Sequence, residues 1–200
     1  MMDVAVIDSG GANIGSVCCA LERLGARAEL TADPERIRRA ERVILPGVGA
    51  AGAAMRHLRA TGLDRLIPQL GQPLLGICLG MQLLFESSEE DDVRCLGLLA
   101  GCVRRLPGSD RVRVPHMGWN ALERERESPL LDGIADDAHA YFVHGYAVPV
   151  GADCVASSEH GTRFAALVQR GRISGAQFHP ERSAATGARI LDNFLGGDRR

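Results

Sequence analysis

The chain has 200 residues, of which 46% are hydrophobic and 24% charged, and its formal net charge is −2. This is the composition of an ordinary soluble globular protein, and a single domain over residues 1–200 can bury a sizeable core. The small net charge disfavours nucleic acid as a partner, and the complete absence of lysine excludes a Walker phosphate loop and a Schiff-base mechanism.

The apolar runs are shorter than a membrane span, and the first residues lack the pattern of a signal peptide. We therefore expect a cytoplasmic protein that does not contact a membrane. The six cysteines are scattered and include an adjacent pair, which is a poor disulfide framework, so we expect reduced thiols. Without Cys-x-x-Cys or His-Glu-x-x-His motifs, we expect neither a metal site nor a cofactor.

The first half alternates between short β-branched runs and stretches with helical spacing. Strands are predicted at Val4–Asp8, Ala28–Leu30, Val43–Leu45 and Leu74–Ile77, and helices at Asn13–Leu24, Pro34–Ala40 and Ala51–Leu70. This alternation predicts parallel βαβ units, and hence an α/β fold with a largely parallel central sheet flanked by helices.

After about residue 95 the pattern changes to short strand-like runs separated by Gly and Pro, which predict an added antiparallel portion of the sheet. These runs are Cys102–Leu106, Ala140–Val143, Cys154–Ser157, Phe164–Gln169 and Arg172–Phe178, followed by a predicted helix at Ala184–Leu195. The acidic cluster Glu89–Asp92 is predicted to be a solvated helix end and loop. Around Trp119, the residues Pro115, His116 and Asn120 favour a surface turn.

The sequence PLLGICLGMQ at residues 73–82 places Cys78 between an apolar run and an amphipathic stretch. Gly-x-Cys-x-Gly has the layout of the nucleophile elbow of hydrolases, in which Gly76 and Gly80 would permit a strained turn that exposes the thiol. The N-terminus of the following helix favours a thiolate, and the Leu79 N–H would point toward an oxyanion. A buried, inert thiol is the alternative for any single cysteine.

A thiol nucleophile needs a base, and His179 lies in GAQFHPERS directly after a predicted strand. Pro180 biases His179 toward an extended conformation, which would project His179 and Glu181 to the same side. The carboxylate could then orient one imidazole nitrogen while the other faces the thiol, as in a catalytic triad. A satisfied strand-end histidine is the alternative. The histidines interpreted as structural or surface residues are His57, His139 and His160.

A glycine-containing segment, Pro46-Gly47-Val48-Gly49, follows another predicted strand at the edge of the sheet where Cys78 is expected. Glycines there permit backbone angles that can turn the Val48 N–H toward a substrate carbonyl, and a peptide flip between two orientations is sterically feasible. A simple turn explains the same residues. Gly10-Gly11 lacks the spacing of a dinucleotide-binding loop and is interpreted as a turn.

Taken together, GICLGMQ, GAQFHPE and LPGVG resemble the class I (triad) glutamine amidotransferases, whose domain hydrolyses glutamine through a cysteine thioester and supplies ammonia to a synthase. Two further stretches, VPHMGWN and YFVHGY, are similar to the glutamine amidotransferase subunits of imidazole glycerol phosphate synthases. The resemblance extends from about residue 3 to about residue 195 and implies a flavodoxin-like fold.

The resemblance implies roles for the matched residues. Cys78 would be the nucleophile, His179 the base and acid, and Glu181 the orienter, with the Val48 and Leu79 N–H groups as the expected oxyanion hole. Contacts to glutamine are implied at Gly47, Gly49, Gln82, His144, Gly145 and Tyr146. Gly145 replaces a hydroxyl residue of the family pattern, so a side-chain contact is lost there while a backbone contact can remain.

The resemblance also implies a separate (βα)₈-barrel cyclase as the partner in a heterodimer of histidine biosynthesis. That cyclase would combine ammonia with phosphoribulosyl-formimino aminoimidazole carboxamide ribonucleotide, giving imidazole glycerol phosphate and aminoimidazole carboxamide ribonucleotide. The residues expected at the contact are Asn13, Trp119, Asn120, Tyr141 and Arg182. A core position is the alternative for Trp119. Arg182 stands where many relatives carry lysine, which keeps the charge but changes its reach.

Two other functions share some of these features. The glutaminase subunit of another synthase, such as pyridoxal phosphate synthase, would have the same Cys–His–Glu set but should lack PHMGWN. A non-catalytic regulatory subunit would keep the fold, but such proteins usually lose a member of the triad.

Overall fold

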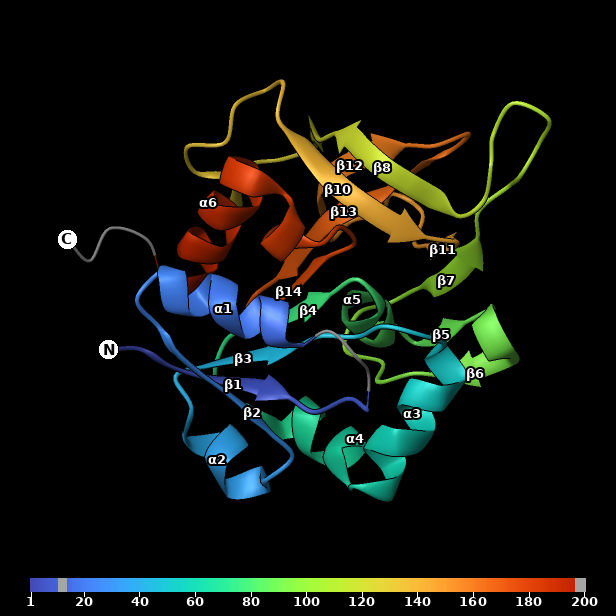
Figure 1. The fold of residues 1–200 in the computed structure, drawn as a ribbon. Helices are drawn as coiled ribbons and strands as arrows, with labels where there is room; N and C mark the ends of the chain where they lie inside the picture. Colours follow the sequence, from blue (N-terminus) through green and yellow to red (C-terminus); the bar gives the residue numbers. More distant parts are fainter. Residues whose placement is uncertain (11–13, 197–200) are drawn as a thin grey trace.

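A computed structural model describes residues 1–10 and 14–196 of the chain, and its main element is an eight-stranded sheet in the order β2-β1-β3-β4-β14-β13-β12-β9 (Figure 1). The strands from β2 to β14 pair in parallel, and the others continue the sheet with antiparallel pairs. The α/β prediction with an added antiparallel portion is therefore confirmed, and the parallel part has flavodoxin-like order. The bounds are β1 Asp3–Ile7, β2 Arg27–Thr31, β3 Arg42–Leu45, β4 Leu74–Ile77, β9 Glu123–Arg124, β12 Cys154–Glu159, β13 Arg163–Arg170 and β14 Ile173–Ala176.

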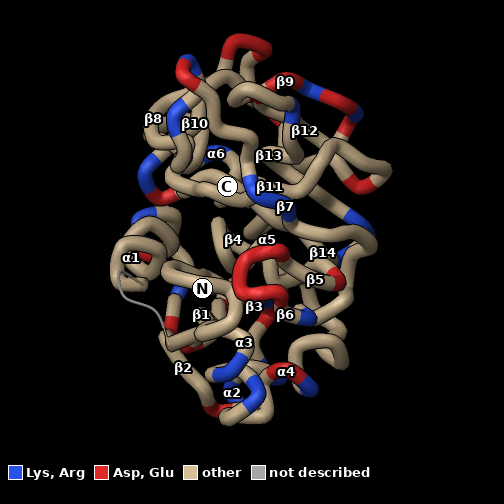
Figure 2. The backbone as a smooth tube through the Cα atoms, turned by 90° about the vertical axis from the view of Figure 1, so that its right-hand side faces the viewer, with Lys and Arg blue, Asp and Glu red and all other residues tan. Residues whose placement is uncertain are grey.

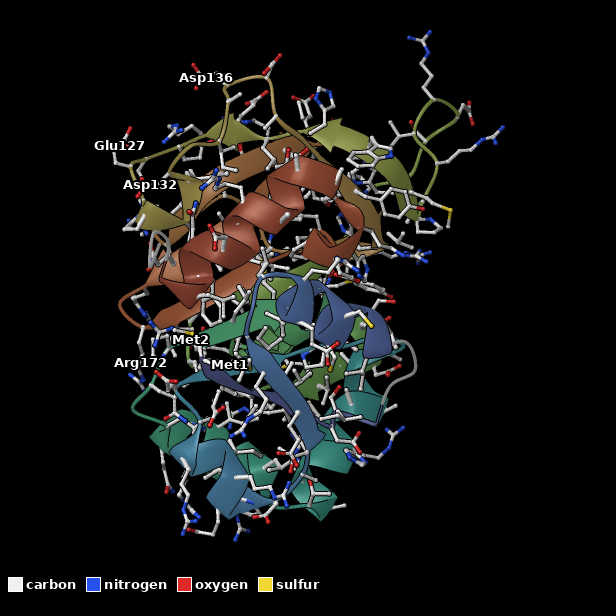
Figure 3. The ribbon with its side chains drawn as sticks, turned by 60° about the vertical axis from the view of Figure 1, so that its left-hand side comes forward. Met1, Met2, Glu127, Asp132, Asp136 and Arg172 are labelled. Carbon is white, nitrogen blue, oxygen red and sulfur yellow. The ribbon has the colours of Figure 1, made fainter. Side chains whose placement is uncertain are left out.

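Helices cover both faces of this sheet. One face is covered by α1 (Gly15–Arg23) and α6 (Ala184–Leu195) (Figure 3). These helices share an apolar core with Val6 of β1. On the other face, α2 (Pro34–Arg39) and α3 (Ala51–Ala60) share a second core with the next residue of the same strand. Successive strand residues point to opposite faces, so the central strands are buried on both sides. Within the described ranges, no helix combines the length and apolar character that a membrane crossing requires.

The predicted helix over residues 51–70 is wrong at Gly62. There the chain takes a φ of +72°, a left-handed conformation that glycine adopts without a steric penalty, and α3 gives way to α4 (Leu63–Leu66). A 3₁₀ turn, Ile67–Gln69, completes the segment. The apolar spacing resembled one long helix because both helices contribute to the same core.

Two smaller sheets lie beside the carboxyl end of the main sheet (Figure 1). The first pairs β8 (His116–Ala121) with β10 (His139–His144) in antiparallel register. The predicted surface turn around Trp119 is therefore wrong, because β10 supplies a pairing partner that is distant in the sequence. In β8 His116 is buried, while Met117 and Trp119 are exposed on the opposite face. The second sheet contains β5 Ser87–Ser88, β6 Val93–Arg94, β7 Cys102–Arg105 and β11 Tyr146–Ala147, and the remaining 3₁₀ turns are Glu90–Asp92, Pro129–Leu131 and Pro180–Arg182.

The acidic cluster Glu89–Asp92 lies just before β6 and is red in Figure 2. Two of its carboxylates cap a helix. The Glu90 carboxylate accepts a hydrogen bond from the Ala51 N–H at 2.9 Å, and Asp91 accepts from the Gly52 N–H at 3.1 Å. These N–H groups open α3, whose own N-cap residue provides no side-chain acceptor. The predicted solvated segment is present at the exposed Asp91, but Glu90 is half-buried, and the prediction missed that both carboxylates cap α3.

Candidate active site

Cys78 stands at the corner between β4 and the short helix α5 (Leu79–Leu83). Its backbone has φ 53° and ψ −114°, a conformation that non-glycine residues rarely adopt and that stores about 1–3 kcal/mol of strain. The Cys78 N–H donates to the Ala176 carbonyl at 2.7 Å, which ties the corner to β14. With 8% of its surface exposed, the residue is enclosed but reachable.

The glycines beside Cys78 permit close approach of backbones. A Cβ atom on Gly80 would lie 1.8 Å from the Leu45 carbonyl oxygen, and one on Gly76 would lie 2.6 Å from the Gly80 carbonyl oxygen. Neither glycine has a positive φ, so the strain of the elbow falls on Cys78 itself. Gly80 is needed because the first turn of α5 rests directly on the end of β3, and Gly76 is needed because the same turn also rests on β4.

His179 follows β14 and meets Cys78 at the carboxyl edge of the sheet. Burial alone would lower the pKa of the imidazole, but hydrogen bonds to Cys78 and Glu181 and their charges outweigh burial and raise that pKa to about 10. An imidazole that holds its proton this firmly beside a sulfur atom favours a thiolate–imidazolium pair.

Glu181 lies on the far side of the imidazole. Its Oε1 atom is 2.9 Å from Nδ1 of His179, and only 3% of its side chain is exposed. The other oxygen, Oε2, is buried and has no hydrogen-bond partner among the described residues. The contact with Nδ1 is the one side-chain hydrogen bond of this buried carboxyl group among the described residues, so this geometry can hold the imidazole in a single orientation.

A cavity of about 190 Å³ opens in front of Cys78. It brings together most of the residues that the sequence predicted at the site, whereas Gly47 and Glu181 do not line it. The lining residues are Val48, Gly49, Cys78, Leu79, Gln82, Glu90, Val143, His144, Gly145, Tyr146 and His179.

The segment before Ala50 borders the same cavity. A Cβ atom on Gly47 would lie 2.7 Å from the Gly80 backbone nitrogen, so this segment packs directly on the start of α5. Gly49 has a φ of +94°, a backbone conformation that favours glycine, and the Val48 side chain is exposed. The N–H groups of Val48 and Leu79 therefore belong to adjoining backbones at one end of the cavity.

Glu90 is a cavity residue that the sequence analysis missed. Burial raises the pKa of its carboxyl, the bond from Ala51 lowers it, and the charge of Asp91 raises it again. Its own sequence surroundings gave no signal, because four consecutive acidic residues are typical of a solvated loop. Only the contact with α3 brings this carboxylate to the cavity.

Both hydrogens of the Gln82 amide nitrogen are used by the protein. Its Nε2 atom donates to the Tyr146 carbonyl at 2.8 Å and to Oε1 of Gln177 at 3.0 Å. Gln177 then places its own amide nitrogen 4.0 Å from the Cys78 sulfur. Gln82 thus shapes the cavity wall, and both hydrogens of its amide are engaged.

The residues predicted at the partner contact separate into two groups. Trp119 is 54% exposed and makes an edge-to-face contact with Tyr141, with ring centroids 6.0 Å apart. Arg182 is also exposed, on the turn that carries Glu181. Asn120 points to the other face of β8, where its amide lies 3.3 Å from Nε2 of His116. Asn13 lies outside the described residues.

No group of three or more His, Cys, Asp or Glu side chains in residues 1–10 and 14–196 is placed to hold a metal ion. The cavity itself offers a thiol, two imidazoles, a carboxylate and backbone N–H groups. This set suits nucleophilic attack on a carbonyl carbon with transfer of one proton.

The chain matches the family model described as glutamine amidotransferase class-I over residues 5–196. It is 62% identical over 195 residues to the imidazole glycerol phosphate synthase subunit HisH of Xanthomonas campestris pv. campestris strain 8004, with 98% of each chain covered. To the protein of the same name from Xylella fastidiosa strain Temecula1 it is 59% identical over 198 residues, with 99% of each chain covered.

Two solved structures share the fold at low identity. A putative GMP synthase subunit from Thermoplasma acidophilum has a TM-score of 0.77 at 20% identity, covering 98% of this chain and 93% of that one. A structure described as a glutamine amidotransferase has a TM-score of 0.74 at 22% identity, covering 96% of each chain. At these identities the likeness concerns the fold alone.

Proposed function

The chain belongs to the class I glutamine amidotransferase family, and we propose that it is the glutaminase subunit of an imidazole glycerol phosphate synthase. The observation that carries the proposal is the cavity in which Cys78 meets His179, in a chain similar over its length to proteins of that name. The reaction is hydrolysis of L-glutamine to glutamate and ammonia.

The first half of the reaction forms a thioester. The Cys78 thiolate attacks the carboxamide carbon of glutamine, and the N–H groups of Leu79 and Val48 stabilise the oxyanion that develops. As the C–N bond breaks, the His179 imidazolium gives its proton to the leaving nitrogen, and ammonia departs. In the second half, neutral His179 takes a proton from water, the hydroxide attacks the thioester, and glutamate leaves with the thiolate restored.

Two carboxylates, Glu181 and Glu90, orient the catalytic base and bind the substrate, respectively. Glu181 holds His179 through Nδ1, so the other ring nitrogen faces the sulfur throughout the cycle. Glu90 lines the cavity with one oxygen engaged by Ala51, and its negative charge suits the ammonium group of the substrate. Gly49, His144, Gly145 and Tyr146 complete the binding surface for glutamine.

The partner in this proposal is a (βα)₈-barrel cyclase, which receives the ammonia in a heterodimer of histidine biosynthesis in the cytoplasm. Its contact surface would include the exposed pair Trp119 and Tyr141, together with Arg182 and the segment that contains Asn13. Aromatic residues and arginine are the residue types that most often anchor such interfaces.

Activation by the partner follows from the oxyanion hole. If the Val48 peptide points its N–H away in the isolated protein, only Leu79 remains as donor. Loss of one such donor typically costs on the order of a hundred- to a thousandfold in turnover, so a flip of this peptide accounts for a large activation. The nucleotide-loaded cyclase favours the flipped state by acting across its contact surface.

The test is glutamate release by the isolated chain, by the chain with the cyclase, and by the chain with the cyclase plus its nucleotide substrate. We expect low activity in isolation and full activity only in the loaded complex. An isolated chain within about twofold of the loaded complex contradicts the proposed activation, because one missing donor has a far larger effect. Absence of hydrolysis in every mixture would indicate a non-catalytic role instead.

A further inference from the structure

Two buried imidazoles connect β8 to the wall of the cavity. Nδ1 of His116 lies 3.0 Å from Nε2 of His144, and Nδ1 of His144 lies 2.9 Å from the Tyr146 carbonyl oxygen. At the outer end, Nε2 of His116 lies 3.3 Å from the amide nitrogen of Asn120. These contacts form a continuous path from the strand that carries Trp119 to the segment 144–146 at the cavity.

The partners of these atoms fix the tautomer of both rings. A backbone carbonyl only accepts, so Nδ1 of His144 carries the hydrogen and its Nε2 accepts from the Nδ1–H of His116. His116 is then free to accept at Nε2 from Asn120, whose amide can only donate through its nitrogen. The Asn120 amide is oriented independently, because it donates to the Glu159 carbonyl at 2.7 Å and accepts from the Ala121 N–H at 2.9 Å.

Both rings are held in the neutral form that this pattern requires. Burial lowers the pKa of His144 to about 3, a shift that the bond to Tyr146 opposes and the neighbouring histidines reinforce. Burial and the charge of His160 lower the pKa of His116 to about 4. Near neutral pH neither ring takes a second proton, so the direction of the hydrogen bonds stays the same.

The path continues from the Tyr146 carbonyl to the cysteine. That oxygen accepts from His144 and from Gln82, and Gln82 orients Gln177 toward the Cys78 sulfur. Each N–H hydrogen along the path has one acceptor. Rotating an amide group by 180° would exchange its oxygen and nitrogen and would lose a buried hydrogen bond. A displacement of β8 therefore changes the cavity wall.

We propose that His116 and His144 form a positioning pair that sets residues 144–146 at the glutamine cavity according to the placement of β8. This inference rests on the proposed glutaminase function and adds to it a physical route between the partner surface and the substrate. His116 lies behind the wall and acts through His144. Its replacement should therefore alter glutamine binding more than the chemical step.

The tautomers test the geometry without any assay of function. Nitrogen NMR of the imidazoles near neutral pH should find hydrogen on Nδ1 and none on Nε2 in both His116 and His144. Hydrogen on Nε2 of either ring overturns the proposal, whatever reaction the chain catalyses.

Binding of L-glutamine tests the positioning role. On a Cys78→Ala background, which cannot turn over, His116→Phe keeps the ring stack but loses both hydrogen bonds, and calorimetry should find binding weakened on the order of tenfold. His116→Asn retains a donor toward His144 and should recover most of the affinity. If His116→Phe does not fold, Asn120→Leu interrupts the same path at its outer end and should also weaken binding.

His160→Phe is the matched control, because His160 stacks on His116 with ring centroids 4.2 Å apart while its ring nitrogen bonds the Arg113 carbonyl, outside the path. It should bind glutamine like the parent. Equal losses for the two Phe variants, or no loss for His116→Phe, overturn the proposal.

In the assembled complex with Cys78 intact, His116→Phe should raise KM about tenfold while kcat changes less than about threefold. A fall in kcat at unchanged KM overturns the positioning role. Failure of the cyclase to activate the parent chain would contradict the proposed function alone, because the tautomers and the binding experiment do not depend on the cyclase.

Discussion

Nδ1 of His179 lies 2.9 Å from Oε1 of Glu181, although the two residues are only two positions apart. The turn that begins at Pro180 brings both side chains together, and the Ser183 hydroxyl closes it by donating to the His179 carbonyl at 2.7 Å. The His179 N–H donates to the Tyr141 carbonyl at 3.0 Å. The orienting carboxylate therefore comes from the same turn as the imidazole, and a strand of the proposed partner surface holds that turn in place.

Cys78 should be the first thiol to react with iodoacetamide, because it lines the cavity beside the protonated imidazole of His179. Burial raises the pKa of Cys95 to about 11 and that of Cys154 to about 12, which keeps both as unreactive thiols. Peptide mass mapping after brief exposure identifies the modified site. In His179→Asn, labelling of Cys78 should slow on the order of tenfold or more, and an unchanged rate would argue against the ion pair.

Glu181→Gln should retain more glutaminase activity than His179→Ala. The amide can still accept from Nδ1 but carries no charge to stabilise the imidazolium, whereas loss of the imidazole removes the proton donor itself. In the serine protease triad the orienting carboxylate is roughly fifty- to a hundredfold more dispensable than the base, and a similar ratio is expected here. Glutamate release by the loaded complex measures both; equal rates for the two variants would remove the orienting role.

Acid should destabilise the protein through the two buried imidazoles. The pKa of His116 is lowered from 6.5 to about 4 and that of His144 to about 3, so between pH 6.5 and pH 4 the unfolded chain binds protons that the folded chain does not. Their contribution is fully present above pH 6.5 and is lost as the pH falls, by about 1.4 kcal/mol per pH unit for each ring.

The measurement for this acid effect is urea unfolding at a series of pH values. His116→Phe should reduce the slope of the free energy of unfolding against pH by the contribution of one proton. The control His139→Phe, at an exposed position, should leave this slope unchanged. His179 does not contribute in this range, because its raised pKa keeps it protonated in the folded chain, and below pH 6.5 it is protonated in the unfolded chain as well. If the unsubstituted chain, His116→Phe and His139→Phe all lose the same free energy of unfolding as the pH falls, groups other than His116 cause the acid effect.

Gly80→Ala should prevent the elbow from forming. The added methyl would lie 1.8 Å from the Leu45 carbonyl oxygen, a backbone atom that cannot move without disrupting β3. We expect a loss of about 3 kcal/mol or more in the free energy of unfolding, measured with urea. Gly71→Ala is the control, because nothing lies within 4 Å of its added methyl, and its effect should stay within about 0.5 kcal/mol.

Trp119→Ala should weaken binding of the cyclase without destabilising the chain, because the indole is more than half exposed. An aromatic anchor is worth about 2 kcal/mol or more, so calorimetry should find Kd raised roughly thirtyfold. Val150→Ala removes another exposed apolar side chain away from β8 and should leave Kd unchanged. Normal affinity and normal coupled turnover in Trp119→Ala would place the contact surface elsewhere.

The sequence was sufficient to predict features that depend on neighbouring residues. The alternation of short strands and helices follows from side-chain periodicity, and every strand predicted in the parallel part is present. The elbow at Cys78 and the pairing of His179 with Glu181 are also local, since each is encoded within about five residues. Local geometry of this kind is limited by steric rules that act along the chain.

Other features depend on segments that are distant in the sequence. His116 and His144 are 28 positions apart, and Glu90 reaches Ala51 across 39 positions. Residues 116–121 resembled a turn because the strand that pairs with them comes later in the chain. Which remote segments meet is decided by the packing of the whole molecule, where burial of two cores outweighs local preference. The sequence by itself determined the reactive groups and the sheet class, and the tertiary structure decided which groups surround the cavity and how they connect to the surface.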